Sequence, residues 1–311
     1  MRIDVINLKK YFGGTHAVDD ISFSFTGGEV IGFVGPNGAG KTTTMRILAT
    51  LDEPTEGDAL LDGVSVVEEP EKARHLVGYV PDALPAHRDI SVHDYLDFFA
   101  RAYGIKGRER RNVIESVEEF TNLSGIREKT LHSLSKGMKQ RVSLGRSLLH
   151  DPPVLIMDEP AAGLDPRARI ELRELLRVLA GRGKAILISS HILTELAEIC
   201  SGAVIIEQGK LLMAGTIDRL LSGHENVSHR TVLIRPLDRQ EEMYRELLQM
   251  PHVQNARLAG PDIAIDVSGA DDACSDILTA LVQSGFRLIE FKQERANLED
   301  IFMNLTRGEV Q

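Results

Sequence analysis

Cysteine is scarce in this chain, and its two cysteines offer no metal site. Cys200 and Cys274 are the only ones among 311 residues, and they lie far apart in the sequence. Neither belongs to the closely spaced pairs of zinc or redox motifs, and together they form no disulfide framework. We therefore interpret both as buried or incidental thiols of a cytosolic protein.

Long apolar runs are also missing, as is an excess of positive charge. No stretch approaches the roughly 20 apolar residues of a membrane-spanning helix, and Met1–Val5 does not resemble the start of a signal peptide. We expect that the chain does not cross a membrane by itself. The net charge of −10 disfavours a general nucleic-acid binder. The densest basic segment, Arg108–Arg111, is typical of a solvated helix face, so no nucleic-acid partner is expected.

A glycine-rich loop is the most informative feature that the sequence does contain. Residues 35–43 have the G-x-x-x-x-G-K-[ST] pattern of a phosphate-binding P-loop. The apolar run Val30–Val34 before it predicts a buried strand, and Thr44–Leu48 after it predicts a helix. Helix-start N–H groups attract anions, and glycines let the backbone close around phosphate oxygens. We assign Lys41 to the β- and γ-phosphates and the Thr42 hydroxyl to Mg²⁺. The predicted nucleotide-binding residues of this loop are Gly35, Pro36, Asn37, Gly38, Ala39, Gly40, Lys41, Thr42 and Thr43.

Two further apolar strands lead to polar side chains that suit the same site. Val154–Met157 is followed by Asp158, which can hold Mg²⁺, and by Glu159, which can polarise a water for attack on the γ-phosphate. The strand Ala185–Ile188 leads to His191, a candidate for orienting that water, because strand carboxyl ends face the ligand crevice of an α/β sheet. The alternatives are an acidic strand end and a capping or packed histidine.

A second candidate phosphate site precedes a predicted helix. Ser135 and Gly137 come just before the helix that we expect over Lys139–His150. A serine cap and a helix N-terminus suit a phosphate. Since the chain already has one phosphate loop, this one would serve the nucleotide of another subunit. The same pattern is also common in ordinary helix caps.

The pattern of strands and helices predicts two domains. Residues 1–222 alternate strands and helices, with a helical subdomain at about 83–150, and polar residues after Ser222 predict a linker. Residues 223–311 predict a β-α-β-β-α-β order, typical of a ferredoxin-like domain, plus a last helix. The expected elements of this tail are Thr231–Ile234, Asp238–Met250, Val253–Leu258, Ile263–Val267, Asp271–Ser284, Phe286–Phe291 and Asn297–Leu305.

Taken together, residues 1 to about 220 resemble the ABC ATPases, the nucleotide-binding subunits of ABC transporters. The P-loop is similar to their Walker A motif, Leu155–Glu159 to Walker B with its catalytic glutamate, and Leu134–Gln140 to the signature motif. Ala162–Asp165 is similar to the D-loop, which adds Asp165 to the site. The remaining matches are the switch histidine, His191, and the ring that stacks on adenine, Tyr11. The implied fold is an α/β P-loop NTPase core with an inserted helical subdomain.

Two departures from the family pattern stand out. The signature motif usually reads Leu-Ser-Gly-Gly-Gln, whereas here Lys136-Gly137-Met138 follow Ser135, a variant that resembles one branch of export ATPases. Most members also have a glutamine where this chain has Asp82. Asp82 can still offer an oxygen to Mg²⁺, but with a charge and a shorter reach. The way in which this site is coupled to a membrane subunit therefore does not follow from the family pattern.

The resemblance implies an ATP hydrolase that uses ATP and Mg²⁺ and acts as a head-to-tail homodimer. Each ATP would lie between the P-loop of one copy and Ser135 and Gly137 of the other. Separately encoded membrane permease subunits would be its partners, which places the chain in the cytoplasm against the inner face of the cell membrane. Export is the expected direction. The alternative is a soluble ABC ATPase that acts on nucleic acid or ribosomes. The tail would support the dimer, bind a regulator or sense a ligand.

Overall fold

A parallel sheet forms the central layer of the first part of the chain. The computed structural model describes residues 1–84, 89–190, 199–222, 230–269 and 271–293. These residues form two compact units, one within residues 1–220 and one within 221–301, and each is described by itself. In the first unit the six strands lie in the order β10-β9-β3-β8-β7-β6, all parallel except β10. Their bounds are β3 Val30–Val34, β6 Val77–Val80, β7 Val154–Met157, β8 Ala185–Ser190, β9 Gly202–Glu207 and β10 Lys210–Thr216.

The three strands that lead to the predicted site are buried along their whole length. Every residue of β3, β7 and β8 is buried, as expected of parallel strands that are covered on both faces. The predicted strands at 30–34 and 154–157 have the observed bounds. The third predicted strand extends two residues further, to Ser190. These apolar runs therefore place the residues that follow them at one edge of the sheet.

A second sheet covers one face of the first, and its strands were missing from the prediction. Its order is β2-β1-β4-β5, antiparallel throughout. A large apolar core fills the space between the two sheets, where Phe23 of β2, Phe33 of β3 and Met45 of α1 are buried together. The bounds are β1 Arg2–Phe12, β2 Thr15–Thr26, β4 Glu56–Leu61, β5 Val64–Ser65, α1 Lys41–Leu48 and α2 Pro70–Leu76.

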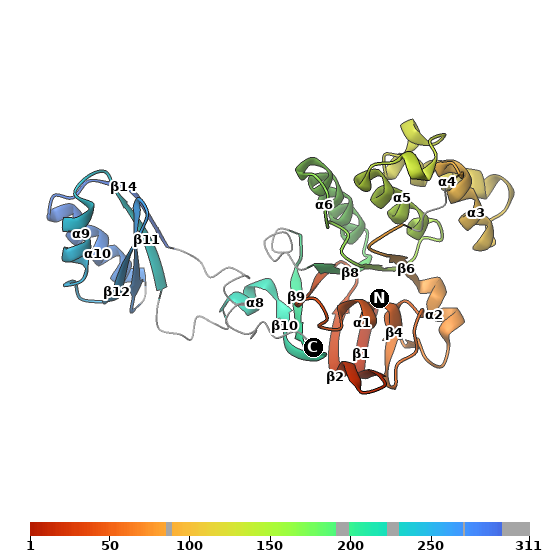
Figure 1. The fold of residues 1–311 in the computed structure, drawn as a ribbon, viewed down its shortest axis with the longest axis horizontal. Coiled ribbons are helices and arrows are strands. Elements are labelled where there is room, and N and C mark those ends of the chain that lie inside the picture. The colour runs from red at the N-terminus through yellow and green to blue at the C-terminus, as the bar shows by residue number, and fades with distance from the viewer. Residues whose placement is uncertain (85–88, 191–198, 223–229, 270, 294–311) are drawn as a thin grey trace. The chain divides into compact units, whose positions relative to one another are not determined.

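Helices form a separate group on the side of β6 and β8 (Figure 1). Helices α3, α4 and α5 contact one another, α5 contacts β6, and α6 contacts β8. The predicted start of α5 was wrong by three residues, because Ser135 caps the helix and the first turn begins at Lys136. The bounds are α3 Val92–Ala102, α4 Gly107–Phe120, η1 Ser124–Ile126, η2 Leu131–Ser133, α5 Lys136–Leu148, α6 Pro166–Gly181 and α8 Ile217–Ser222.

The second unit has the predicted β-α-β-β-α-β order. Its antiparallel sheet has the order β12-β13-β11-β14, and the buried residues of α9 and α10 share an apolar core with it. The bounds are β11 Arg230–Pro236, α9 Gln240–Leu247, β12 Val253–Ala259, β13 Asp262–Val267, α10 Asp271–Gln283 and β14 Leu288–Gln293. The helix predicted over Asn297–Leu305 lies outside the described residues.

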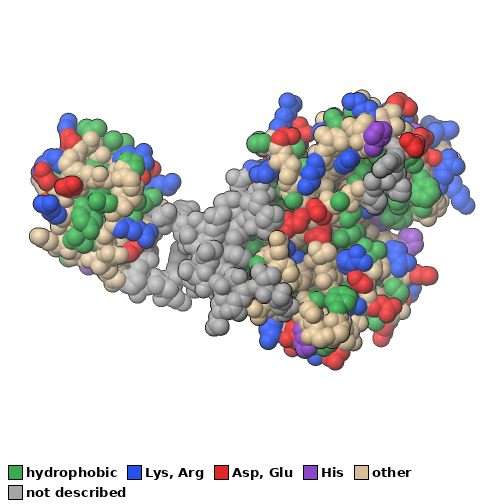
Figure 2. All heavy atoms as spheres, viewed as in Figure 1, with side chains coloured by type: hydrophobic (Ala, Val, Ile, Leu, Met, Phe, Trp, Pro, Cys, Tyr) green, Lys and Arg blue, Asp and Glu red, His purple; other side chains and the backbone are tan. Residues whose placement is uncertain are grey.

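Two surface properties bear on partners. Among the described residues no helix is both long and apolar enough to span a bilayer. On the face drawn in Figure 2, acidic and basic side chains are interspersed over most of both units, and one group of acidic side chains lies near the middle of the first unit.

Candidate functional site

The loop between β3 and α1 fits closely against two neighbouring strands. Gly38 and Gly40 have left-handed backbones, with φ of 82° and 99°, a conformation that glycine adopts without a steric penalty. A Cβ on Gly40 would lie 2.2 Å from the Ala17 carbonyl oxygen, and one on Gly35 would lie 2.4 Å from the Ile206 carbonyl oxygen. Packing therefore requires glycine at 35 and 40, and the left-handed backbone favours it at 38 and 40.

Lys41 is the buried charge of this loop. Its side chain is 6% exposed, and its ammonium donates to the carbonyl oxygens of Gly35 at 2.7 Å and Pro36 at 3.1 Å. Burial lowers the pKa of Lys41, and attraction to Glu159 and Asp158 opposes that shift. The two carboxylates thus lie close enough to act on the ammonium electrostatically. This arrangement holds a positive charge where the loop would receive phosphates.

Asp158 and Glu159 are held by a serine on the neighbouring strand. Ser189 Oγ donates to Asp158 Oδ1 at 2.7 Å and accepts the Glu159 N–H at 2.8 Å. Asp158 is 4% exposed, and its N–H donates to the Val80 carbonyl oxygen at 2.8 Å. Glu159 has a left-handed backbone with φ of 48°, a conformation that costs a non-glycine residue about 1–2 kcal/mol. The chain therefore leaves the strand sharply after Asp158, and Ser189 secures that turn.

Ser189 was not among the predicted site residues. It is fully buried, near the end of a strand whose first four residues are apolar. Two adjacent serines at the end of such a strand, Ser189 and Ser190, were the available signal, because a buried hydroxyl needs a partner. The pairing of Val34 with Ser190 and of Met157 with Ile188 puts the P-loop and the two carboxylates at the same sheet edge.

Tyr11 lies in the hairpin between β1 and β2. Its ring stacks on His16 with a centroid distance of 4.1 Å, and its hydroxyl donates to Asp19 Oδ1 at 3.3 Å. One face of the tyrosine is thus supported within the hairpin. A ring held in this way has a stable orientation, which suits the predicted stacking on a base.

The turn between β9 and β10 connects this hairpin to the P-loop. Gly209 donates its N–H to the Ala39 carbonyl oxygen at 3.1 Å, and its own carbonyl accepts the Asp19 N–H at 2.8 Å. Its backbone is left-handed, with φ of +77°, and a Cβ would lie 2.9 Å from the His16 carbonyl oxygen. A single residue therefore contacts both halves of the predicted nucleotide site.

We expect Gly209→Ala to weaken nucleotide binding although the residue carries no side chain. The added Cβ clashes with the hairpin backbone and strains the left-handed turn, a cost of roughly 1–3 kcal/mol. The measurement is a fluorescent-ATP titration alongside thermal unfolding. Gly63→Ala is the control, because Gly63 is also left-handed, at φ +86°, but no atom lies within 4 Å of its Cβ position. Equal affinities in the two variants would contradict the connecting role of Gly209.

The residues predicted to face a second nucleotide form another cluster. Ser135 caps α5, and its Oγ accepts the Met138 N–H at 3.3 Å. Asp165 caps α6, and its Oδ1 accepts the Ala168 N–H at 2.9 Å. A Cβ on Gly137 would lie 3.3 Å from the Ala168 Cβ, so the starts of the two helices are closely packed. The structure thus brings Ser135, Gly137 and Asp165 together at the starts of two neighbouring helices.

The predicted magnesium ligands fit that ion without forming a metal cage. Thr42 and Asp82 are exposed, whereas Asp158 is buried. Among the described residues, no group of three or more histidines, cysteines and carboxylates is placed to hold a metal. Mg²⁺ is commonly held by one or two carboxylates together with substrate phosphates, which matches this donor set. His191 lies outside the residues that the structure describes.

A glycine-rich loop between a parallel strand and a helix, with two carboxylates directly after a nearby strand, defines a P-loop nucleotide-binding protein. The family described as "ABC transporter" matches residues 18–162. "Nod factor export ATP-binding protein I" of Bradyrhizobium diazoefficiens is 33% identical over 311 residues, which cover 100% of this chain and 98% of that protein. "Linearmycin resistance ATP-binding protein LnrL" of Bacillus subtilis is 30% identical and covers 96% of each chain.

Solved structures agree with this assignment. One titled as an ATP-binding subunit of an ABC transporter has a TM-score of 0.66 and 28% identity, and it covers 80% of this chain and all of its own. A dimeric cassette in a post-hydrolysis state with ADP and phosphate has a TM-score of 0.63 and covers 69% of this chain and 98% of its own. At 23% identity it supports the fold alone. The chain belongs to the ATP-binding proteins of ABC transporters.

Proposed function

We propose that this chain hydrolyses ATP to drive a membrane exporter and works as a head-to-tail pair of identical copies. The carrying observation is the sheet edge where β3 leads to the P-loop with its buried Lys41 and β7 leads to Asp158 and Glu159, both of which Ser189 holds. One ATP would lie between the P-loop of one copy and Ser135 and Gly137 of the other, with Tyr11 stacked on adenine. A two-fold axis makes two such sites equivalent.

The phosphates are bound by the loop and its lysine. Backbone N–H groups of the loop and of the start of α1 present partial positive charge, and Lys41 adds a full charge that burial makes more effective. Thr42 and Asp158 would hold Mg²⁺, with Asp82 as a further oxygen donor. When bound, that ion neutralises charge on the phosphates.

Hydrolysis needs a water in line with the γ-phosphate and a base for its proton. We assign the base to Glu159, whose backbone position is fixed by Ser189. The water oxygen bonds to the γ-phosphorus as the bond to ADP breaks, and the carboxylate accepts the water's proton. We assign His191 to orienting that water. Because the γ-phosphate is shared by both copies, its release removes a contact between them and lets the pair open.

The names of two relatives support the export role. They are described for Nod factor export and for linearmycin resistance, and both are ATP-binding proteins of comparable length. We infer separate membrane subunits as partners, with this chain on the cytoplasmic face of the membrane. The tail, residues 223–311 in our sequence-based assignment, we interpret as an extension that supports the dimer. An action on nucleic acid or ribosomes has no comparable support.

Two experiments test the proposal: one measures the mass of the chain in solution, and the other identifies the proteins that co-purify with it from membranes. With magnesium and ATP, a hydrolysis-deficient form of the chain should double its mass in light scattering, whereas ADP should leave it unchanged. From membranes, the tagged full chain should co-purify with an integral membrane protein. A chain that stays monomeric with ATP, or that captures ribosomes or DNA instead, would refute the proposed function.

A further inference from the structure

Strand β6 lies at the edge of the central sheet, and side chains of α5 bond to its outward backbone groups. It is the last strand in the order β10-β9-β3-β8-β7-β6. The carbonyl oxygen of Val77 accepts a hydrogen bond from His150 Nε2 at 3.1 Å, and that of Tyr79 accepts one from Arg146 Nη2 at 2.7 Å. Burial lowers the pKa of His150, so its ring is neutral at pH 7 and donates from Nε2. Helix α5 thus supplies donors that a further strand would otherwise provide.

The same two side chains of α5 pack against a row of aromatic rings that belong to α3 and its C-terminal cap. Tyr95, Phe99 and Tyr103 recur at intervals of four residues and therefore share one face of that helix. The Arg146 guanidinium lies 5.2 Å from the centroid of the Phe99 ring, and the His150 ring stacks on Tyr103 at 4.0 Å. Burial raises the pKa of Tyr95, and the charge of Arg146 and a hydrogen bond from it oppose that shift. Arg146 and His150 each therefore join α3 to one backbone carbonyl of β6.

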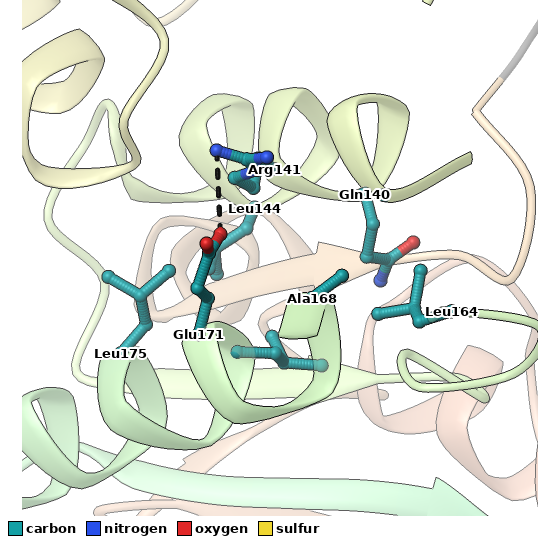
Figure 3. A pocket seen from close by; sticks show the side chains of 9 residues that line it. Gln140, Arg141, Leu144, Leu164, Ala168, Glu171 and Leu175 are labelled. Atoms are coloured by element: carbon teal, nitrogen blue, oxygen red, sulfur yellow. Dashed lines mark ion pairs between the residues drawn. The ribbon is translucent and has the colours of Figure 1, made fainter. Parts of the chain in front are cut away.

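Toward its start, α5 packs on α6 rather than on β6. Leu144 of α5 and Ala168 of α6 line a small pocket between the two helices (Figure 3). Beside that pocket Arg141 pairs with Glu171 at 3.6 Å, which joins the two helices (Figure 3). The helix that carries Arg146 is therefore held by α6 in its N-terminal part and by β6 in its C-terminal part. The fold thus sets the position of the guanidinium.

The two bonds to β6 lie at opposite ends of that strand, and only the bond from Arg146 lies next to the predicted site. Tyr79 is followed by Val80, whose carbonyl oxygen accepts the Asp158 N–H at 2.8 Å. Val77, by contrast, is the first residue of the strand and lies at its far end. Arg146 therefore fixes the peptide unit directly before the one that binds Asp158.

We propose that Arg146 is a positioning residue for ATP hydrolysis. By holding the Tyr79 carbonyl it fixes the end of β6, and the next carbonyl of that strand holds the backbone of Asp158. Asp158 is the carboxylate that we assign to Mg²⁺, and Glu159, the assigned base, follows it directly. The inference rests on the proposed function, because it gives Arg146 a part in the hydrolysis assigned there. Arg146 acts through the backbone and not on the nucleotide, so its loss should slow the chemical step and leave ATP binding unchanged.

The test replaces each of the two α5 side chains in the full chain. Arg146→Met keeps the stem and removes the guanidinium, and Arg146→Lys keeps a charged donor. His150→Leu is the matched control, because it removes the same kind of bond between the same helix and the same strand. We expect Arg146→Met to lower kcat by roughly tenfold or more, since a displacement of about 1 Å can cost about 100-fold, with the affinity for fluorescent ATP unchanged. Arg146→Lys should recover part of that loss. His150→Leu should lower the melting temperature and leave kcat unchanged.

Hydrogen exchange at the Asp158 amide gives a readout that does not depend on catalysis. Amides of β8 serve as the reference, because that strand is buried along its whole length. Relative to them, the Asp158 amide should exchange faster in Arg146→Met than in the unchanged chain, because the strand end that accepts its hydrogen bond is no longer held. In His150→Leu its relative rate should stay the same.

The outcomes separate this inference from the function beneath it. If the unchanged chain does not turn ATP over, the proposed function is refuted and the role of Arg146 in hydrolysis falls with it. If the unchanged chain is active, a normal kcat in Arg146→Met overturns the inference. Equal losses of kcat in Arg146→Met and His150→Leu, in step with melting temperature, also overturn it, because both residues would then act through folding alone.

The exchange rates decide the route of the effect. A loss of kcat in Arg146→Met alone, together with faster exchange at Asp158, supports the inference, whereas a loss without faster exchange overturns the route through Asp158. If Arg146→Met does not fold, Arg146→Lys takes its place, with a smaller expected loss of kcat and the same criteria.

Discussion

Glu159→Gln should reduce ATP turnover by roughly 10²–10⁴-fold, the range expected when a general base is removed. The amide keeps the shape of the side chain but cannot accept the proton of the attacking water. The backbone should be unaffected, since the Glu159 N–H bond to Ser189 Oγ does not involve the carboxylate. ATP binding is therefore expected to persist, and the bound state should accumulate. Phosphate release under single-turnover conditions measures the chemical step directly.

The control for this variant is Glu174→Gln on α6. Glu174 is exposed and paired with Arg177 at 2.9 Å, so its loss changes the charge of the chain by the same amount at a distant surface. Turnover in Glu174→Gln should equal that of the unchanged chain. Normal turnover in Glu159→Gln would remove this residue from the chemistry, and equal slowing in both variants would point to charge alone.

The strands and loop of the nucleotide site could be predicted because their signals are local. A continuous apolar run such as 154–157 identifies a covered parallel strand, and the P-loop pattern carries its own geometry. The antiparallel sheet lacked such a signal. Strand β1 pairs with β2 through several register shifts, and Asn7 and Asp20 have left-handed backbones within those strands. Bulges interrupt the alternation of apolar and polar residues on which strand prediction depends.

Contacts between distant segments could not be predicted from one sequence. Ser189 lies 30 residues from Glu159, and Gly209 lies 170 residues from Ala39, yet each supplies a hydrogen bond that positions the site. Neither residue type is distinctive, because serine and glycine occur throughout the chain. The motifs predict which residues perform the chemistry, whereas the packing indicates which residues position them.

Lys41→Met should weaken ATP binding by more than a hundredfold, while the chain still folds. Each hydrogen bond to a charged group contributes about 1.5–3 kcal/mol, and loss of two such contacts with phosphate exceeds the roughly 2.8 kcal/mol of a hundredfold change. Burial lowers the pKa of Lys41, so the charge is costly in the folded chain and its removal relieves part of that cost. The expected result is therefore a large change in affinity with a small change in melting temperature, measured by titration and calorimetry.

Lys184→Met is the matched control, because Lys184 is also a buried lysine. It is 8% exposed, and its ammonium donates to Asp151 at 2.6 Å and to the Pro152 carbonyl oxygen at 2.7 Å. It directly precedes β8, a strand parallel to β3, and so lies at the sheet edge opposite the P-loop. Its loss should lower the melting temperature and leave ATP affinity unchanged. If instead both variants lose affinity in proportion to stability, the effect of Lys41→Met is one of folding and the ammonium of Lys41 is not a phosphate ligand.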